Sequence, residues 1–404
     1  MIPREKVFIV AGEASGDVYA GRLVLALKNI RPDVEILGVG GDSLSSAGGK
    51  VIVHINELST FGIAEVFAKL PKLALIFLKV LEAIRKEEPK VVVMIDYPDF
   101  NLRLAWFIRK FYGNSVKILY YITPQVWIWR KWRARALAQL VDRLAVVFPF
   151  EKPIFRRLGI ETDFVGHPLL ETIPMDLDKE EIRKYFGLSP TLTTIALLPG
   201  SRKGEIKNYL PEMVSAVKEL QDDRSFQFLL ARAPTISEED LNPYLEGIEV
   251  IREVHGETHK VLKVADLAVV ALGTATLESA LIGTPAILVG KVHPVTYWFS
   301  TRFLDMDLPY FGLINFILKR KAFPELIQDE MKGIKIASAV RELISNPKAM
   351  ELLRKSAEEV KNSLVGVEKH ITEMGRVMGT AGGVNASKSA SQRTALLLVE
   401  LLES

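Results

Sequence analysis

The chain has 404 residues, about half of them apolar and a quarter charged, which is ordinary usage for a folded protein and excludes a disordered chain. This length is too great for one comfortable core and fits two domains. Cysteine is absent, which excludes disulfides, thiolate metal sites and a cysteine nucleophile. No uncharged apolar run reaches the roughly 18 residues of a membrane span, and the first residues lack the pattern of a secretory signal.

Charge is distributed unevenly along the chain. Residues 1–170 carry 24 basic and 17 acidic side chains, a net +7, whereas the remainder carries 28 and 32, a net −4. Four of the five tryptophans also lie in the first part. A basic, aromatic-rich half favours an anionic and partly apolar partner, such as a membrane surface. Taken alone, the charge is explained at least as well by an uneven distribution without function.

The predicted elements follow a βαβ rhythm from the first residues. Helical patterns cover 16–30 and 64–88. Before, between and after these helices lie continuous apolar runs, which are typical of strands that are buried on both faces of a parallel sheet. These strands are predicted at 6–12, 35–41, 90–96, 117–123 and 144–150.

The rhythm breaks over residues 165–190 and then starts again. The second series predicts strands at 194–202, 226–232, 248–253, 266–274 and 285–291, with helices at 205–221 and 275–283. We therefore predict an α/β protein of two doubly wound, Rossmann-type domains that face a cleft. The expected domains are 1–170 and 171–378, followed by 379–404 as a loop and a terminal helix that returns to the first domain.

The first strand runs into "VAGEASGD", residues 10–17. Its spacing fits neither the dinucleotide fingerprint nor the P-loop. Gly12 permits a ligand to approach the backbone closely, and Ser15 or Asp17 is placed to cap the following helix. Capping explains Asp17 as well as any function does. It does not explain Glu13, which we expect at the lip of the cleft.

A buried strand also ends in "VVVMIDYPDFN", residues 91–101, which carries two carboxylates and an amide. An aspartate directly after a buried strand must be solvated, paired or used. Asp96 ends the strand, and Asp99 and Asn101 follow within five positions.

In the second half, "LLPGSRKGEI" (197–206) ends a strand and opens a helix. Gly200 and Ser201 precede a helix start whose free N–H groups suit an anion, and Arg202 adds a bidentate donor. We count Glu205, in the first turn, with this site. The alternative is a solvated arginine on a turn.

A second helix start of this kind lies in "ALGTATLESALIGTPAILVG", residues 271–290. Gly273, Thr274 and Ala275 form the turn, and Glu278 lies one turn into the helix, within reach of a ribose. Compensation of the helix dipole is the alternative explanation of Glu278. Two anion-binding helix starts in one domain favour a nucleoside diphosphate.

The "GTATLE" element resembles the nucleotide-sugar motif of GT-B glycosyltransferases. Over nearly the whole chain the motifs occur in the same order as in the lipid-A-disaccharide synthase family, and "IDYPDFN" and "TPQVWIWR" are the most specific of them. Leu272 departs from the small residue expected before the glycine. The matching motifs are "VAGEASGD", "GIAEV", "IDYPDFN", "YYITPQVWIWR", "FPFEK", "FVGHPL", "LLPGSR", "GTATLE" and the region through "INFILKR".

The resemblance implies a GT-B fold and the transfer of 2,3-diacylglucosamine from UDP to 2,3-diacylglucosamine 1-phosphate (lipid X), with inversion to a β-1,6 linkage. It implies no metal and no cofactor, and it places Asn315 among the substrate-binding residues. It also implies a cytoplasmic enzyme that is peripheral on the inner membrane. The sequence leaves a homodimer open, and we expect no nucleic-acid partner.

An inverting transfer needs a base that takes the proton of the acceptor's 6-hydroxyl as it attacks. Asp96 matches the family's first motif aspartate and is the predicted base, with a structural loop residue as the alternative. Asp99 and Asn101 are expected to shape the loop or to orient Asp96. Arg202 and the helix starts would stabilise the UDP leaving group in place of a metal.

The stretch 62–81 is apolar almost all round, with interspersed lysines, and Pro71 is expected to prevent a single clean helix. Because both proposed substrates are acylated, we interpret it as a basic, apolar membrane surface that 126–136 reinforces. A fully buried helix is the alternative, and nucleic-acid binding by 126–136 is less favoured because no recognition fold accompanies it. The predicted membrane patch consists of Val66, Phe67, Leu70, Leu73, Ile76 and Phe77.

Two other function classes remain open. One is a different GT-B UDP-sugar enzyme, such as an epimerase or a transferase of peptidoglycan synthesis. The other is a non-catalytic protein that binds nucleotide sugars or lipids and would tolerate the loss of Asp96. The six histidines show no metal-ligand spacing, and His167, between the domains, is more often a linker residue than a substrate contact.

Overall fold

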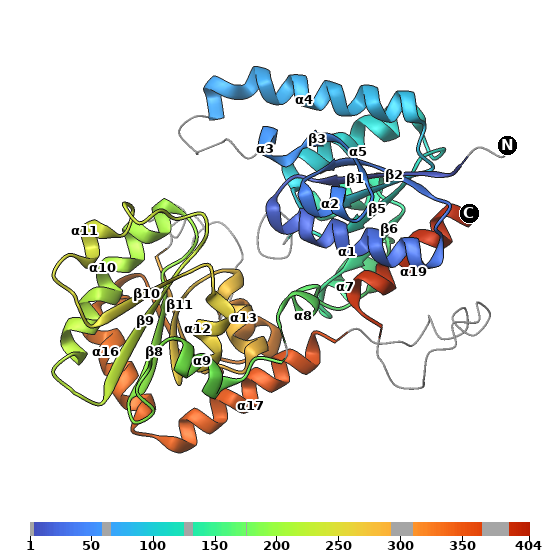
Figure 1. Ribbon diagram of the computed structural model, residues 1–404. Coiled ribbons are helices and arrows are strands. Elements are labelled where there is room, and N and C mark those ends of the chain that lie inside the picture. Colours follow the sequence, from blue (N-terminus) through green and yellow to red (C-terminus); the bar gives the residue numbers. More distant parts are fainter. Residues whose placement is uncertain (1–3, 59–65, 125–131, 175, 292–309, 366–387) are drawn as a thin grey trace. The chain divides into compact units, whose positions relative to one another are not determined.

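The computed structural model describes residues 4–58, 66–124, 132–174, 176–291, 310–365 and 388–404 (Figure 1). Its internal contacts divide the chain into two units, residues 1–168 with 364–404, and residues 169–363. The sequence placed these divisions at 170/171 and 378/379. The terminal helix α19 (Ala390–Glu403) packs against α1 (Ala14–Ile30) within the first unit.

The first unit is built on a parallel sheet whose order is β3-β2-β1-β4-β5-β6-β7. The central strands are apolar throughout because helices cover both faces of the sheet. In the described residues these strands are β1 (Lys6–Ala11), β2 (Glu35–Gly40), β3 (Lys50–His54), β4 (Val91–Ile95), β5 (Lys117–Tyr121), β6 (Arg143–Val146) and β7 (Glu161–Phe164).

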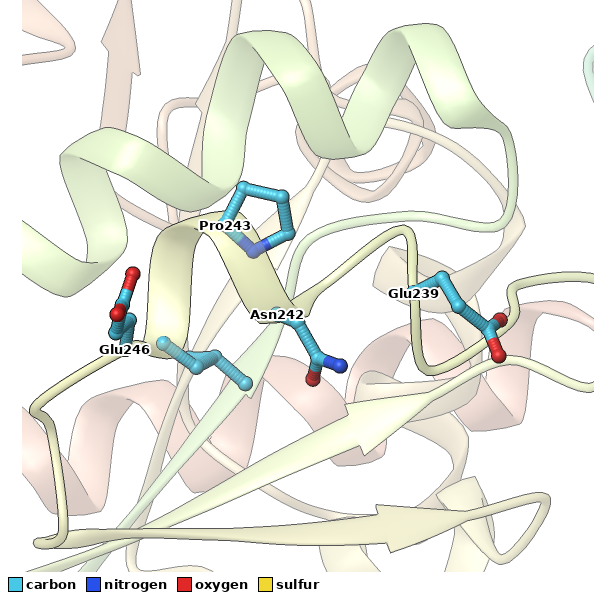
Figure 2. Close-up of a pocket in the computed structure, with 5 residues that line it drawn as sticks. Glu239, Asn242, Pro243 and Glu246 are labelled. Atoms are coloured by element: carbon cyan, nitrogen blue, oxygen red, sulfur yellow. The ribbon is translucent and has the colours of Figure 1, made fainter.

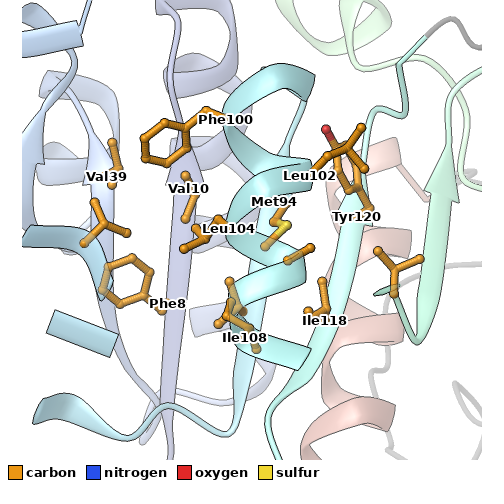
Figure 3. Close-up of a cluster of buried hydrophobic side chains, with 14 of the residues drawn as sticks. Phe8, Val10, Val39, Met94, Phe100, Leu102, Leu104, Ile108, Ile118 and Tyr120 are labelled. Atoms are coloured by element: carbon orange, nitrogen blue, oxygen red, sulfur yellow. The ribbon is translucent and has the colours of Figure 1, made fainter. Parts of the chain in front are cut away.

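One face of this sheet packs on α4 and α5, and the other packs on α1 and α19. Figure 3 shows the α5 side, where Phe8 and Val10 of β1 meet Leu104 and Ile108 of the helix. Among the residues described in this unit, the other helices are α2 (Asp42–Ser46), α3 (Ile55–Leu58), α4 (Val66–Glu87), α5 (Pro98–Tyr112), α6 (Trp132–Leu140) and α7 (Glu151–Arg156).

The second unit repeats the pattern with a parallel sheet of order β10-β9-β8-β11-β12-β13. Its strands are β8 (Thr193–Leu198), β9 (Phe226–Arg232), β10 (Ile251–His255), β11 (Leu267–Ala271), β12 (Ala286–Gly290) and β13 (Glu325–Ile327). Helix α10 packs on α16, and α12 packs on α13. Outside residues 175 and 292–309, which are not described, the helices are α8 (Leu169–Thr172), α9 (Lys179–Tyr185), α10 (Lys203–Leu220), α11 (Asn242–Leu245), α12 (Thr258–Val264), α13 (Thr274–Ile282), α15 (Leu313–Leu318), the 3-10 turn η2 (Gln328–Glu330), α16 (Gly333–Ile344) and α17 (Pro347–Ser363).

The prediction of two doubly wound α/β sheets is confirmed, and the strands that it missed lie at the sheet edges. The central strand predicted at 194–202 is shorter: β8 ends at Leu198, because the chain turns there toward α10, whose N-cap is Arg202. Strands β3, β7 and β13 were not predicted; each is an outermost strand, so it lacks the long apolar run of a central strand. Strand β10 starts at Ile251 rather than 248, because a left-handed turn at Gly247 precedes it.

The interpretation of residues 62–81 needs two corrections. Helix α4 runs unbroken through Pro71, because one missing N–H near its start does not outweigh the packing of Ile76 and later residues in the core. Ile76 is 4% exposed, and Leu73 and Phe77 pack partly buried against the same core, so they are not a free apolar surface. The side chains of Val66, Phe67 and Leu70 lie outside the described residues, as does most of 126–136.

Both sheets reverse their strand order beside the first strand, between β1 and β4 and between β8 and β11. Ligands of doubly wound sheets bind at the carboxyl ends of the strands that flank such a reversal. Glu13 and Asp96 follow β1 and β4, and Arg202 and Gly273 follow β8 and β11. These four predicted site residues therefore lie at the topological switch point of their unit, whereas Asn315 lies on α15, before the outermost strand β13.

Candidate active site

The chain after β4 makes a turn that ordinary side chains avoid. Asp96 and Tyr97 both have left-handed backbones, with φ of 46° and 49°. Left-handed backbone costs a non-glycine residue on the order of 1–3 kcal/mol and persists only where its surroundings impose it. Such strain is concentrated at functional sites, which makes this strand end the leading candidate in the first unit.

Hydrogen bonds fix the backbone of Asp96 on both sides. Its N–H donates to the carbonyl of Tyr121 at 3.1 Å, which continues the sheet ladder. Its carbonyl accepts from the hydroxyl of Tyr120 and from Nδ2 of Asn101, each at 2.7 Å. Asn101 therefore orients the backbone of Asp96, one of the two roles predicted for it.

The Asp96 carboxyl is a stronger base than an ordinary aspartate. Burial, together with the negative charge of Glu13, raises the pKa of Asp96 to about 6. Glu13 is exposed and follows β1, whose residue Ala11 pairs with Ile95 of β4. A carboxylate with this pKa is ionised at neutral pH and accepts a proton more readily than a solvated one.

The residues around the first Gly turn have structural duties that the sequence did not show. A Cβ on Gly12 would lie 2.2 Å from the Tyr97 ring, so this glycine makes room for Tyr97 rather than for a ligand. The predicted cap of α1 is wrong: its N-cap is Glu13, without a side-chain hydrogen bond, and Ser15 is exposed in the first turn. Buried Asp17 instead accepts backbone N–H bonds around the start of α2, from Gly41 (2.6 Å), Ser43 (2.9 Å) and Leu44 (3.1 Å).

Two further polar groups lie at this edge of the first sheet. Asp99, in the first turn of α5, forms an ion pair with the largely buried Arg133 of α6, so it helps to fix the turn. His167 follows β7 and packs on Phe148, with ring centroids 5.2 Å apart. Burial lowers the pKa of His167 to about 3, so the imidazole is neutral at physiological pH.

In the second unit, a glutamate in the first turn of α10 already binds backbone N–H groups at the start of that helix. The Glu205 carboxylate accepts from the backbone N–H of Ser201 at 2.8 Å and of Arg202 at 3.2 Å. The expectation of free N–H groups is therefore wrong at these two positions. Gly200 is left-handed (φ 113°), and the Arg202 side chain is 79% exposed, so its guanidinium remains accessible.

The start of α13 is the more open anion site. Its N-cap, Gly273, has φ 151° and no side-chain cap, and both Gly273 and Thr274 are exposed. Ala275 follows in the first turn, so three backbone N–H groups lie in the part of the helix that has no intrahelical acceptor. The unexpected Leu272 lies against Gly290 of the next strand and leaves the turn open.

Glu278 lies beside a residue that sequence reasoning missed. Its carboxylate is 3.8 Å from Nε2 of His259, in the first turn of α12. The only sequence signal for His259 was its position just after a predicted strand. The pair brings a carboxylate and an imidazole next to the open start of α13.

Asn315 is fully committed inside the protein. Its Nδ2 donates to the Phe323 carbonyl (2.8 Å) and to Glu325 (2.9 Å), and its Oδ1 accepts from the N–H groups of Ala322 (2.9 Å) and Phe323 (2.8 Å). The side chain is completely buried. These contacts assign Asn315 to the support of the loop before β13. They use all the hydrogen-bonding capacity of its amide, so the side chain does not contact a ligand directly in this geometry.

The remaining pocket does not suit the predicted nucleotide. A surface pocket of about 610 Å³ beside α11 contains none of the predicted residues (Figure 2). Its two carboxylates, Glu239 and Glu246, do not suit an anionic nucleotide. Within the described residues, no cluster of three metal-ligating side chains occurs, and no helix is long and apolar enough to cross a bilayer.

Comparison with known proteins identifies the family to which the chain belongs. The family model described as "Lipid-A-disaccharide synthetase" matches residues 7–374. The chain belongs to the lipid-A-disaccharide synthase family. Family members include lipid-A-disaccharide synthases of Myxococcus xanthus (39% identical, covering 87% of this chain and 92% of that protein) and Syntrophus aciditrophicus (37%, covering 89% and 93%).

Solved structures resemble this member of the lipid-A-disaccharide synthase family in fold alone. UDP-GlcNAc 2-epimerase from Neisseria meningitidis has a TM-score of 0.62 at 12% identity and covers 92% of this chain and 100% of its own. The calicheamicin glycosyltransferase CalG4 has a TM-score of 0.60 at 16% identity, covering 100% and 99%. The prediction of a GT-B-like fold is confirmed, and the whole-chain family match disfavours the epimerase alternative.

Proposed function

We propose that the chain is an inverting hexosyltransferase that moves 2,3-diacylglucosamine from UDP to 2,3-diacylglucosamine 1-phosphate. The products are the β-1,6-linked lipid A disaccharide 1-phosphate and UDP. The observation that carries the proposal is the family match over residues 7–374. A buried carboxyl of raised pKa at the switch point of the first sheet supports it.

Asp96 is the proposed base. As the acceptor's 6-oxygen bonds to the anomeric carbon, the bond from that carbon to the UDP oxygen breaks. The hydroxyl proton passes to the Asp96 carboxylate. Attack from the face opposite the leaving group inverts the anomeric centre.

The second unit is proposed to bind UDP. The diphosphate would meet the uncapped start of α13, where N–H groups and the helix dipole favour an anion. Arg202 has an exposed guanidinium that can bind a phosphate oxygen or the leaving group. Glu278 would accept hydrogen bonds from the ribose hydroxyls, with His259 beside it.

Acylated substrates favour action at an anionic bilayer, and we propose that α4 contributes the contact surface through its outward face. Leu75 and Leu78 are 67% and 59% exposed, and Lys72 and Lys79 are exposed nearby on the same helix. Apolar side chains inserted among lysines are the usual composition of a helix that lies in the membrane interface.

Helix α5 extends this surface. Phe77 of α4 packs edge-on against Phe107, with centroids 5.3 Å apart, and Trp106 and Phe111 flank Phe107 on the outside. Trp106 and Phe111 are 47% and 66% exposed, and Lys110 lies 4.8 Å from the centre of the Trp106 ring. Aromatic rings beside a lysine suit the headgroup level. A peripheral position on the cytoplasmic face of the inner membrane, and a homodimer, stay predictions.

The test is UDP release by the purified protein from UDP-diacylglucosamine, with and without the 1-phosphate acceptor. We expect release only with acceptor, and Asp96→Asn should lower turnover by about 10²–10⁴-fold while UDP binding is kept. Release without any lipid acceptor would favour another UDP-sugar enzyme. Binding of both substrates without release would favour the non-catalytic alternative.

A further inference from the structure

The carbonyl of Asp96 is held by two buried donors that have no part in the proposed proton transfer. Because Asp96 is left-handed, its carbonyl leaves the sheet ladder, although its N–H stays within it. Tyr120 reaches it from the neighbouring strand β5, and Asn101 reaches it from the helix α5 above. A carbonyl oxygen has two lone pairs, and these two donors use both.

Core packing does not explain either donor. Tyr120 and Asn101 are completely buried, and Tyr120 lies among apolar side chains (Figure 3). Phenylalanine and leucine would fill nearly the same volumes without burying a polar group. Asn101 also lies 3.4 Å from the carbonyl of Ile95, so its amide is directed at the end of β4.

The direction of a side chain depends on the backbone angles of its residue, and the left-handed turn determines where the Asp96 carboxylate points. Ordinary residues leave this conformation when nothing imposes it. We propose that Tyr120 and Asn101 are positioning residues of the base: they hold the turn that presents the Asp96 carboxylate to the acceptor hydroxyl. This inference rests on the proposed function, which assigns the base to Asp96.

The test compares Tyr120→Phe, Asn101→Leu and the double variant with wild type. The control is Tyr112→Phe, the same change at the far end of α5. We expect each single variant to lower kcat by about 10-fold or more, and the double variant to lower it further.

The KM for the UDP donor and the affinity for UDP should not change, because those sites lie in the other unit. The acidic limb of the pH profile should move to lower pH, because a carboxylate that turns toward solvent loses the burial that raises its pKa.

A purely structural role would lower thermal stability without moving the pH profile, and Tyr112→Phe should leave both kcat and the profile as in wild type. Unchanged kcat in folded Tyr120→Phe and Asn101→Leu would overturn the proposal, and so would a lower kcat with an unmoved pH profile. Asn101→Ala removes the donor without adding a charge, and it replaces Asn101→Leu if that variant does not fold. An inactive wild type would instead refute the proposed function, and an active Asp96→Asn would refute the choice of base.

Discussion

The Asp96 carboxyl has a raised pKa because burial and the negative charge of Glu13 disfavour its ionised form. The sequence showed that a carboxylate follows a buried strand, and the family motif selected it. It could not show the left-handed turn, because that depends on Tyr120, which is part of an apolar run typical of a strand. It also assigned Asp17 to the wrong helix, because the N–H groups that Asp17 caps lie more than 20 residues away.

With Asp96 as the proposed base, its raised pKa predicts that activity depends on pH. The base works only when ionised, so kcat/KM should rise with pH through about 6 and level off above it. Glu13→Gln removes a negative charge that raises this pKa, so the acidic limb of the pH profile of kcat/KM should move to lower pH. Initial rates between pH 4.5 and 8 test this, and a limb that stays in place in Glu13→Gln would show that Glu13 does not act on Asp96.

The same shift affects stability. A carboxyl whose pKa is raised on folding stabilises the fold while it is protonated, below about pH 4, and this contribution is lost as pH rises through about 6. Asp96→Asn removes the cost of the buried charge, so it should increase the free energy of unfolding by about 1–3 kcal/mol at pH 8. At pH 4 it should change little. Urea unfolding at both pH values measures the difference, and a variant that is less stable than wild type at pH 8 would contradict the shift.

At the scale of elements, the sequence located both helix starts of the second unit but could not rank them. Glu205 accepts hydrogen bonds from two N–H groups at the start of α10, whereas α13 begins at an uncapped glycine. That difference depends on side-chain conformation, which sequence spacing does not reveal.

Gly273→Ala tests α13 as the diphosphate site. A Cβ there meets nothing within 4 Å, but φ of 151° strains any other residue, so the turn should move and UDP affinity should fall about 10-fold or more. Gly283→Ala is the matched control: it ends the same helix, with φ of 88° and equal space. Calorimetric titration of UDP should separate the two, and equal losses in both would assign the effect to the stability of α13 alone.

Helix α4 shows why an all-round apolar stretch is ambiguous. An apolar residue on every side of the helix does not indicate which side faces the core, and the predicted patch included core residue Ile76. Leu75 and Leu78 point outward instead.

Changing Leu75 and Leu78 to Ser should leave the protein folded and should weaken its binding to anionic liposomes, even in high salt, because salt screens only the lysine contribution. Ile76→Ser, on the same helix, should cost about 2–5 kcal/mol of stability, the scale of a large-to-small change in a core. Liposome flotation and thermal unfolding measure both effects. Full binding by the folded double variant would remove α4 from the membrane surface.

At the scale of the whole molecule, the sequence predicted the duplicated doubly wound pattern because central strands need long apolar runs. The structure added the outer strands and the strand orders. These show that "VAGEASGD", "IDYPDFN", "LLPGSR" and "GTATLE" each follow a strand beside the point where a sheet reverses its order. Gly12 and Asn315 are motif residues whose contacts lie within the protein, because a single sequence does not show whether a residue serves a ligand or its own loop.

We propose that this chain joins two acylated glucosamines with Asp96 as the base. The most direct measurement is mass spectrometry and NMR of the lipid formed from UDP-diacylglucosamine and the 1-phosphate acceptor, with UDP quantified in the same reaction. We expect one β-1,6-linked disaccharide 1-phosphate for each UDP released, and on the order of 10²–10⁴-fold less of both with Asp96→Asn. UDP released without a disaccharide, an α-linked product, or undiminished product from Asp96→Asn would contradict it.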